Sequence, residues 1–124
     1  MQAEAAERLI DEAGRRGISV CLDTSGYGDS QALMTMARKE NVAYILYDMK
    51  AIDDEVHKAY TGVSNKRILE NLEMLATDSR ASGKLILRMP LIKGVNDSEE
   101  MIRRTGEFYR KLGIRRVNLL PYHN

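Results

Sequence analysis

The sequence has one cysteine, no excess of either charge and no long hydrophobic run, and each absence excludes a class of protein. A single cysteine, Cys21, among 124 residues allows no internal disulfide and no cysteine-rich metal site within this chain. Lysine and arginine number 19 and aspartate and glutamate 18, so no basic excess predicts a nucleic-acid partner. No apolar run approaches the roughly 20 residues that span a bilayer, and residues 1–14 resemble an acidic amphipathic helix rather than a targeting peptide. We therefore expect one globular domain in the cytoplasm, without a membrane or nucleic-acid partner.

Two hydrophobic periodicities alternate along the chain. Apolar residues spaced by three and four predict helices, and the short apolar runs between them predict buried strands. Strands are expected at 18–22, 43–47, 84–89 and 116–120, and helices at 3–16, 30–41, 53–60, from Ser64 or Asn65 through Ala76, and between Asp97 and Gly113. The last of these helices is expected to bury Met101, Ile102, Phe108 and Leu112. Strands and helices that alternate at this spacing form a parallel sheet. The sequence therefore predicts an α/β fold, with a parallel sheet of about four strands and helices outside it.

A polar side chain lies at the carboxyl end of each expected strand. The residues are Asp23 and Thr24 for the first strand, Asp48 and Lys50 for the second, Arg88 for the third and His123 for the fourth. In parallel α/β folds, ligands bind outside the carboxyl ends of the strands. Carboxylates bind ammonium groups, ribose hydroxyls or hard cations, whereas arginine and lysine suit a carboxylate or phosphate. The mixture of charges predicts a zwitterionic or polyfunctional small ligand.

Each of these strand-end residues also has a purely structural interpretation. The pair after the first strand can cap its turn, and the pair after the second can form a solvated ion pair. Arg88 can form an ion pair with Asp48 or Asp23 instead of contacting a ligand. His123 stands next to the end of the chain, where composition alone favours an inert tail.

For three other features the sequence favours the structural interpretation. His57 lies among charged residues on an expected helix, which favours a surface role over catalysis. Cys21 alternates with Val20 in an expected buried strand, so we expect it to pack as a small hydrophobic residue. The turn at 25–28 (SGYG) lacks the full glycine fingerprint of a phosphate-binding loop and is a weak signal.

Four strings along the chain, taken together, resemble one enzyme family. They are LDTSGY at 22–27, YDMK at 47–50, the segment from His57 through GVSN at 62–65, and LLPYH at 119–123. In this order and spacing they resemble the glycyl-radical-enzyme activating enzymes, the pyruvate formate-lyase activating enzymes among them. These are radical S-adenosylmethionine (SAM) enzymes, built on a partial, TIM-like barrel of six β/α units. The resemblance covers about residues 17–123.

The resemblance implies specific ligands for the first two strand ends. Asp23 and Thr24 resemble a family position that helps bind SAM and an associated monovalent cation, which would lie near Asp23 and Asp48. Asp48 and Lys50 match the family's Asp-x-Lys sequence, which contacts SAM and supports the peptide substrate loop.

The resemblance also implies roles for the other two strand ends. Arg88 resembles the strand-end arginine near SAM, and His123 matches the histidine of a terminal Leu-Pro-Tyr-His string that contacts SAM. It thereby changes the expectation for His123 from an inert tail residue to a ligand contact. The six strand-end residues are therefore expected to bind the cofactor, and none of them is expected to be a catalytic residue or a metal ligand of this chain.

The family has two sequence features that this chain lacks. The first is a Cys-x-x-x-Cys-x-x-Cys motif, which holds a four-iron cluster whose open iron binds SAM; Cys21 alone cannot replace it, because a cluster needs several thiolates. The second is a Gly-Gly-Glu-Pro string after the second strand, and residues 1–16 resemble the helix that would follow it. The resemblance therefore implies that residues 1–124 form a single, truncated domain, the C-terminal two-thirds of an activating enzyme without the first two strands and the cluster loop.

The resemblance implies an oxidoreductase-type reaction for the parent enzyme. SAM is cleaved reductively to a 5′-deoxyadenosyl radical, which abstracts hydrogen from a glycine of a glycyl radical enzyme. The electron would come from a donor such as flavodoxin or ferredoxin. The chain by itself is expected to be inactive, and its unpaired sheet edges and uncovered apolar surface predict self-association.

Two other functions stay open at this point. One is a non-catalytic binding or assembly module, derived from a partial barrel, that holds a partner's glycine loop. The other is a cluster-free barrel lyase or phosphate-binding enzyme, for which we would expect a Schiff-base lysine within a strand. Lys50 lies past its strand and Lys84 at the start of another, which disfavours the last alternative.

Overall fold

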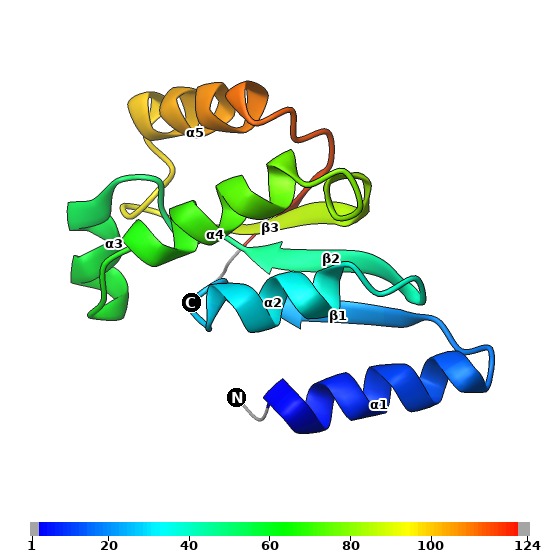
Figure 1. Cartoon of the computed structure of the whole chain (residues 1–124). Helices are drawn as coiled ribbons and strands as arrows, with labels where there is room; N and C mark the ends of the chain where they lie inside the picture. The colour runs from blue at the N-terminus through cyan, green and yellow to red at the C-terminus, as the bar shows by residue number, and fades with distance from the viewer. Residues whose placement is uncertain (1–2, 122–124) are drawn as a thin grey trace.

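The computed structural model describes residues 3–121, and helices alternate with strands along it except between β2 and β3, where two helices follow each other (Figure 1). In chain order the elements are α1 (Ala3–Arg15), β1 (Val20–Thr24), α2 (Ser30–Ala37), β2 (Val42–Asp48), α3 (Asp54–Thr61), α4 (Lys66–Thr77), a 3-10 turn (Ser82–Lys84), β3 (Leu85–Leu91), α5 (Glu99–Lys111) and β4 (Val117–Pro121). The strands form one parallel sheet in the order β1-β2-β3-β4. The predicted α/β fold, with a four-stranded parallel sheet, is confirmed. No described helix is long and apolar enough to cross a membrane.

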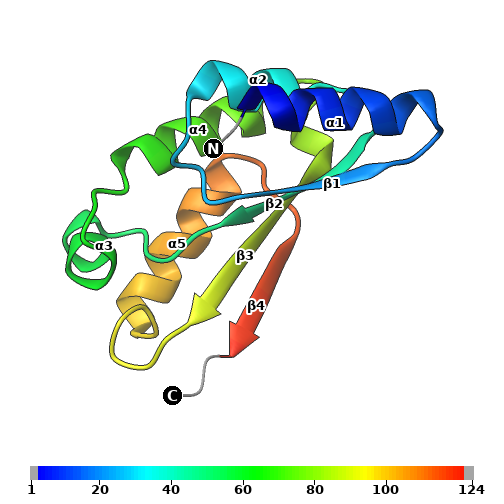
Figure 2. The same cartoon turned by 90° about the horizontal axis from the view of Figure 1, so that it is seen from below.

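The helices lie along one face of the sheet, and the views in Figures 1 and 2 agree on this arrangement. Strand residues alternate between two faces. The face toward the helices, called the covered face here, carries Val20, Leu22, Ile45, Tyr47, Leu85, Leu87 and Met89; the opposite, bare face carries Cys21, Asp23, Tyr44, Leu46, Asp48, Ile86, Arg88, Asn118 and Leu120. The first set packs in the core, whereas each residue of the second set keeps some exposure.

The hydrophobic core lies between the covered face and the helices. Ile45, Leu72, Leu75 and Leu87 have no exposed surface, and they belong to β2, α4 and β3. Tyr47 is equally buried, its hydroxyl donates to the carbonyl of Ile68, and burial raises the pKa of the phenol. A buried hydroxyl needs such a partner, because an unpaired one would cost the full desolvation of the group. The core therefore joins the helices to the two central strands.

The first strand begins two residues later than the sequence predicted. Gly17 has φ +72°, and the N–H of Ile18 donates back to the carbonyl of Ala13 at 2.8 Å. This hydrogen bond closes the C-terminal end of α1 in the manner of a Schellman motif. The connection uses residues 16–19, and consequently Asp23 and Thr24 are part of β1 rather than of the turn after it.

Short polar side chains begin three of the helices. The carboxylates of Asp29 and Asp53 and the hydroxyl of Ser98 each accept a hydrogen bond from the N–H three residues later, which satisfies one of the free donors of a helix start. We expected Asp97 to begin the last helix, and this was wrong. Asp97 instead accepts from the N–H of Gly94 at 2.9 Å, within the loop before α5.

The buried side of α5 also differs from the expected one. Ile102 was expected in the core but is 51% exposed, whereas Met101, Thr105 and Tyr109 are buried. These three residues are spaced by four and lie on one side of the helix. Ile102 instead borders a shallow apolar pocket beside Leu119 of β4.

Candidate functional site

Charged side chains from three neighbouring strands meet on the bare face, near the carboxyl ends of the strands. Asp48 of β2 pairs in register with Arg88 of β3. Asp23 of β1 lies opposite Leu46, which is two residues before Asp48 on the same face. Because side chains alternate with a period of two, all three charged groups project from the bare face. The structure thus brings together three of the residues that the sequence placed at strand ends.

Arg88 bridges the two aspartates. Its Nε donates to Oδ1 of Asp48 at 3.0 Å, and its Nη2 donates to Oδ1 of Asp23 at 2.7 Å. The hydrogen bond to Asp48 is the main cause that raises the pKa of the Arg88 guanidinium. Within residues 3–121, Oδ2 of each aspartate accepts no hydrogen bond. Each carboxylate is therefore oriented by Arg88 and still has an oxygen available to a ligand.

Lys50 adds a second positive charge at the end of β2. Its Nζ lies 4.0 Å from Oδ2 of Asp48, and its side chain is 39% exposed. Together with Asp23, Asp48 and Arg88 it makes a cluster of two positive and two negative charges, which we call the charged cluster. A formally neutral cluster of this kind suits a ligand that carries both charges, and suits a simple anion less well.

The other two predicted strand-end residues are Thr24 and His123. Thr24 lies apart from the charged cluster, and His123 lies beyond the described residues. The Oγ1 of Thr24 accepts a hydrogen bond from the N–H of Gly26 at 3.0 Å, so it shapes the turn after β1. A contact between Thr24 and a ligand stays a prediction. His123 lies outside the described residues, and its role also stays a prediction.

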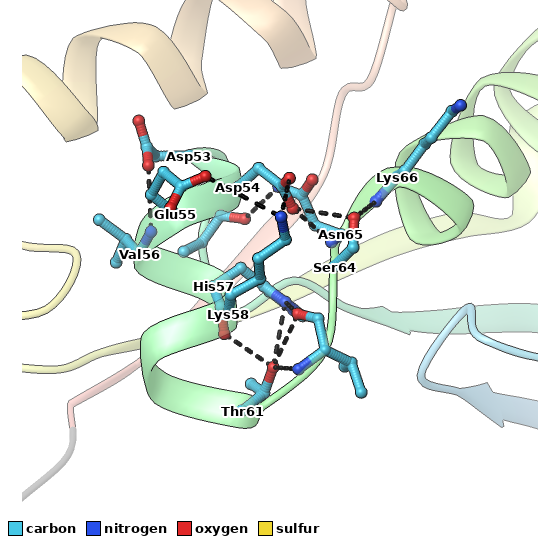
Figure 3. Close-up of polar contacts among 12 residues, drawn as sticks. Asp53, Asp54, Glu55, Val56, His57, Lys58, Thr61, Ser64, Asn65 and Lys66 are labelled. Atoms are coloured by element: carbon cyan, nitrogen blue, oxygen red, sulfur yellow. Dashed lines mark hydrogen bonds and ion pairs between the residues drawn. The ribbon is translucent and has the colours of Figure 1, made fainter.

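His57 is buried, with only 2% of its surface exposed, so the surface role expected from the sequence was wrong. Its Nδ1 lies 2.8 Å from the carbonyl of Val63 and 3.1 Å from Oγ1 of Thr61 (Figure 3). Because a carbonyl oxygen can only accept, Nδ1 carries the proton in this contact. His57 thus ties the C-terminal end of α3 to the segment that follows it.

A second set of contacts holds the same junction between α3 and α4. Oδ1 of Asp54 accepts from the hydroxyl of Ser64 and from the N–H of Asn65, each at 2.9 Å (Figure 3). These hydrogen bonds, led by the one from Asn65, hold the pKa of Asp54 below its usual value. The string at 57–65 that helped to carry the family resemblance is therefore a compact structural unit in this fold.

Three buried asparagines hold the loops at the carboxyl ends of the strands, and we did not select them from the sequence. Asn71 donates to the carbonyls of Gly26 and Gly28 in the loop after β1. Asn65 donates to the carbonyls of Ala51 and Ile52 after β2. The third, Asn96, lies between the ends of β2 and β3. Only Asn71 had a sequence signal: it lies three residues after Ile68 and four before Leu75, on the apolar side of the expected helix, where an asparagine needs hydrogen-bond partners.

The described residues contain no ready-made metal site. Among residues 3–121, no three His, Cys, Asp or Glu side chains come together closely enough to hold one metal ion. Cys21 was expected to be a packed core residue, and this was wrong, because its side chain is exposed on the bare face opposite Tyr44. A lone exposed thiol cannot ligate an iron–sulfur cluster.

The chain matches the family model described as "Radical SAM superfamily" over residues 1–105. It is 42% identical to an isethionate sulfite-lyase activating enzyme of Oleidesulfovibrio alaskensis, over 98% of this chain and 38% of that protein. It is 39% identical to a trans-4-hydroxy-L-proline dehydratase activating enzyme of Clostridioides difficile, over 94% of this chain and 37% of that protein. The chain therefore spans less than two thirds of the length of these curated relatives.

A solved structure has the same fold. A domain of a pyruvate-formate lyase-activating enzyme from Bacteroides vulgatus superposes with a TM-score of 0.85 and 30% identity. The match covers 98% of this chain and 74% of the solved chain. The four-stranded parallel sheet with its helices thus corresponds to a domain of a protein named as an activating enzyme.

Proposed function

The chain belongs to the radical SAM superfamily, among the activating enzymes of glycyl radical enzymes, and from this premise we propose that its charged cluster binds SAM. The observation that supports the proposal is the Arg88 guanidinium held between Asp23 and Asp48 on the bare face. The proposed parent enzyme uses SAM as the source of a 5′-deoxyadenosyl radical that abstracts hydrogen from a glycine of its partner. Within that reaction, these residues bind and orient SAM.

The chemistry of the charged cluster fits the polar groups of SAM. The free oxygens of Asp23 and Asp48 can accept hydrogen bonds from the ammonium group or from ribose hydroxyls. Lys50 offers a positive charge to the carboxylate of the methionine part. Arg88 keeps both aspartates oriented, so the cluster needs little rearrangement on binding. The same two carboxylates are where we propose a monovalent cation.

The residues of this chain do not fit a four-iron cluster. Cys21 is the single cysteine of the sequence, and cluster ligation requires several thiolates. We therefore propose that this chain alone is inactive and that residues outside it supply the cluster in the parent enzyme. In this proposal residues 1–124 are one truncated portion of a partial barrel. The oxidoreductase chemistry belongs to the parent enzyme, and we assign no step of that chemistry to this chain.

The partners follow from the same proposal. We propose a glycyl radical enzyme as the protein substrate, with its glycine loop reaching the bare face beside Lys50, and a flavodoxin or ferredoxin as electron donor. We also propose that the parent works in the cytoplasm, where a reducing environment would keep the exposed thiol of Cys21 free.

Calorimetric titration of the chain with SAM tests the proposal. We expect saturable binding that R88Q weakens by roughly tenfold or more, because that substitution removes both hydrogen bonds that orient the aspartates. R38Q is the matched control: Arg38 forms a comparable ion pair with Asp78, at 2.6 Å, away from the sheet. Equal loss in R38Q and R88Q, or no binding by the wild-type chain, would contradict the proposal.

A second candidate is the non-catalytic module that binds a glycine loop. The exposed surface of Tyr44 and Leu120 on the bare face favours this reading, because apolar surface suits a peptide. Titration with a glycine-loop peptide separates the two functions. Peptide binding without SAM binding would favour the module and exclude the cofactor-binding role.

A further inference from the structure

The ladder between β2 and β3 loses its next donor at Pro90. Met49 donates its N–H to the carbonyl of Arg88 at 2.9 Å, which extends the pairing one residue beyond β2. Along β3 the N–H groups alternate between the two neighbouring strands, and that of Leu87 donates to Arg116 on the β4 side. Residue 90 is three positions further on, so its N–H would point toward β2. Proline has no N–H, and the ladder therefore cannot continue there.

Just beyond this point the side-chain amide of Asn96 connects the two strands. Its Nδ2 donates to the carbonyl of Lys50 at 2.7 Å and to the carbonyl of Pro90 at 2.7 Å. Its Oδ1 accepts from the N–H of Ile92 at 2.8 Å. The residue is completely buried, so water does not compete for these hydrogen bonds. One side chain thus holds together the ends of two strands and the first turn of the loop before α5.

The hydrogen bonds of Asn96 connect to the charged cluster. The carbonyl that it binds belongs to Lys50, and the Nζ of the same residue lies 4.0 Å from Asp48. Arg88 stands two residues before Pro90 on β3 and holds Asp48. Asn96 therefore fixes the backbone on both sides of the Asp48–Arg88 contact. Asn65 and Asn71 bind other loop carbonyls and make no such connection between two strands.

We propose that Asn96 is a positioning residue for SAM binding, which it serves by holding Lys50 against the end of β3. The role rests on the proposed function, since the ligand is SAM in both. The cost of burying an amide is offset only because all of its hydrogen-bonding groups find partners. Such a group holds a defined geometry where an aliphatic side chain of the same size would allow several.

The test compares the full chain with N96A, using NMR relaxation and SAM titration. We expect backbone ¹⁵N relaxation in N96A to show increased motion at 49–52, because the Lys50 carbonyl loses its donor, and SAM affinity to fall by roughly threefold to tenfold. T105A is the control, because Thr105 is also a buried polar residue, and its hydroxyl donates only within α5. We expect T105A to leave both readouts unchanged.

Two double variants separate positioning from general stability. In a K50A background the further loss of SAM affinity on adding N96A should largely vanish, because Asn96 acts through Lys50. P90A supplies an N–H that points toward β2. The double variant N96A/P90A should therefore recover part of the lost order at 49–52. The double variant can be measured in this way even if N96A alone folds poorly.

The outcomes distinguish this role from the proposed function. Failure of the wild-type chain to bind SAM would overturn the proposed function, while the relaxation of 49–52 in N96A and its recovery in N96A/P90A would still decide whether Asn96 positions Lys50. Unchanged relaxation in N96A, or equal SAM losses with and without Lys50, would overturn the role of Asn96.

Discussion

The covered and bare faces are formed by alternate residues of the same strands, but they have different contents. On the covered face Ile45, Tyr47 and Leu87 have no exposed surface and pack against the helices. On the bare face Asp48 and Arg88 keep about a quarter of their side chains exposed and form a hydrogen-bonded charged group. Burial of apolar surface stabilises the fold, whereas partly exposed ion pairs contribute little. One set of residues therefore specifies the fold, and the other is available for a ligand.

The largest effect is expected from a substitution on the covered face. L87A should lower the free energy of unfolding by about 2–5 kcal/mol, because it removes a fully buried side chain and leaves a cavity. I86A, the next residue along β3 and on the bare face, should cost about 1 kcal/mol. Urea denaturation of both variants measures the difference. Equal losses would remove the distinction between the faces.

The second largest loss of stability is expected in the loop that joins β1 to α2. Gly26 has φ +75°, and a Cβ added there would overlap the hydroxyl of Tyr47. G26A should therefore cost about 2 kcal/mol, from backbone strain and overpacking together. G28A is the matched control, since a Cβ at Gly28 meets nothing within 4 Å, and it should change stability by about 0.5 kcal/mol or less. A neutral G26A would show that this loop is not packed against the core.

Acid should lower the stability of the fold through groups outside the core. Within residues 3–121 the core buries no carboxylate that could take up a proton. Hydrogen bonds from Asn65 and Ser64 hold the pKa of Asp54 below its usual value. The ionised group therefore stabilises the fold above the unfolded pKa of about 4, and this contribution is lost as the pH falls through the lower, folded pKa. D54N should lower the free energy of unfolding at neutral pH. It should also make the free energy of unfolding fall less as the pH is lowered, as measured by urea denaturation across pH.

Glu55 provides the control for the acid prediction. It is the next residue on α3 and is exposed, with one long contact to Lys58 at 3.9 Å. E55Q should leave the dependence of stability on pH nearly unchanged. If E55Q and D54N behave alike, the junction between α3 and α4 is not the source of the acid sensitivity.

The smallest effect is self-association through the bare face. Tyr44 and Leu120 are each 46% exposed there, and apolar surface of this kind favours weak dimers, with a Kd on the order of 0.1–1 mM. L120K should abolish the dependence of sedimentation on concentration. L9K, which changes a residue 70% exposed on α1, should not alter it. Sedimentation of the wild-type chain that does not vary with concentration would contradict the prediction.

The fold could be predicted from the sequence because its signals are local. Spacings of three and four among apolar residues, and apolar runs such as 43–47, indicate each element without knowledge of its neighbours. The errors arose where a contact with a distant part of the chain decides whether a side chain is buried. Ile102 has an apolar side chain at a helical position, but it lies beside the outermost strand, where the described chain provides little cover.

The candidate site was predictable only in part. Asp23, Asp48 and Arg88 were placed together because parallel strands bring their carboxyl ends to one edge, and the structure adds the geometry of their contacts. His57 was misjudged because its neighbours in sequence are charged, although one side of that helix faces inward. Asn96 gave no distinct signal, since an asparagine before Asp97 and Ser98 is typical of a turn. Its two strand contacts exist only in the folded chain.

The most direct test of the account is a map of SAM on the chain by amide chemical shifts. We expect SAM to shift the amides of Asp23, Asp48, Lys50 and Arg88, and we expect R88Q to remove these changes. The amides of α1, α2 and α5, which lie on the covered side, should stay where they are. Shifts confined to the helices, or spread evenly over both faces, would contradict the claim that the bare face binds SAM.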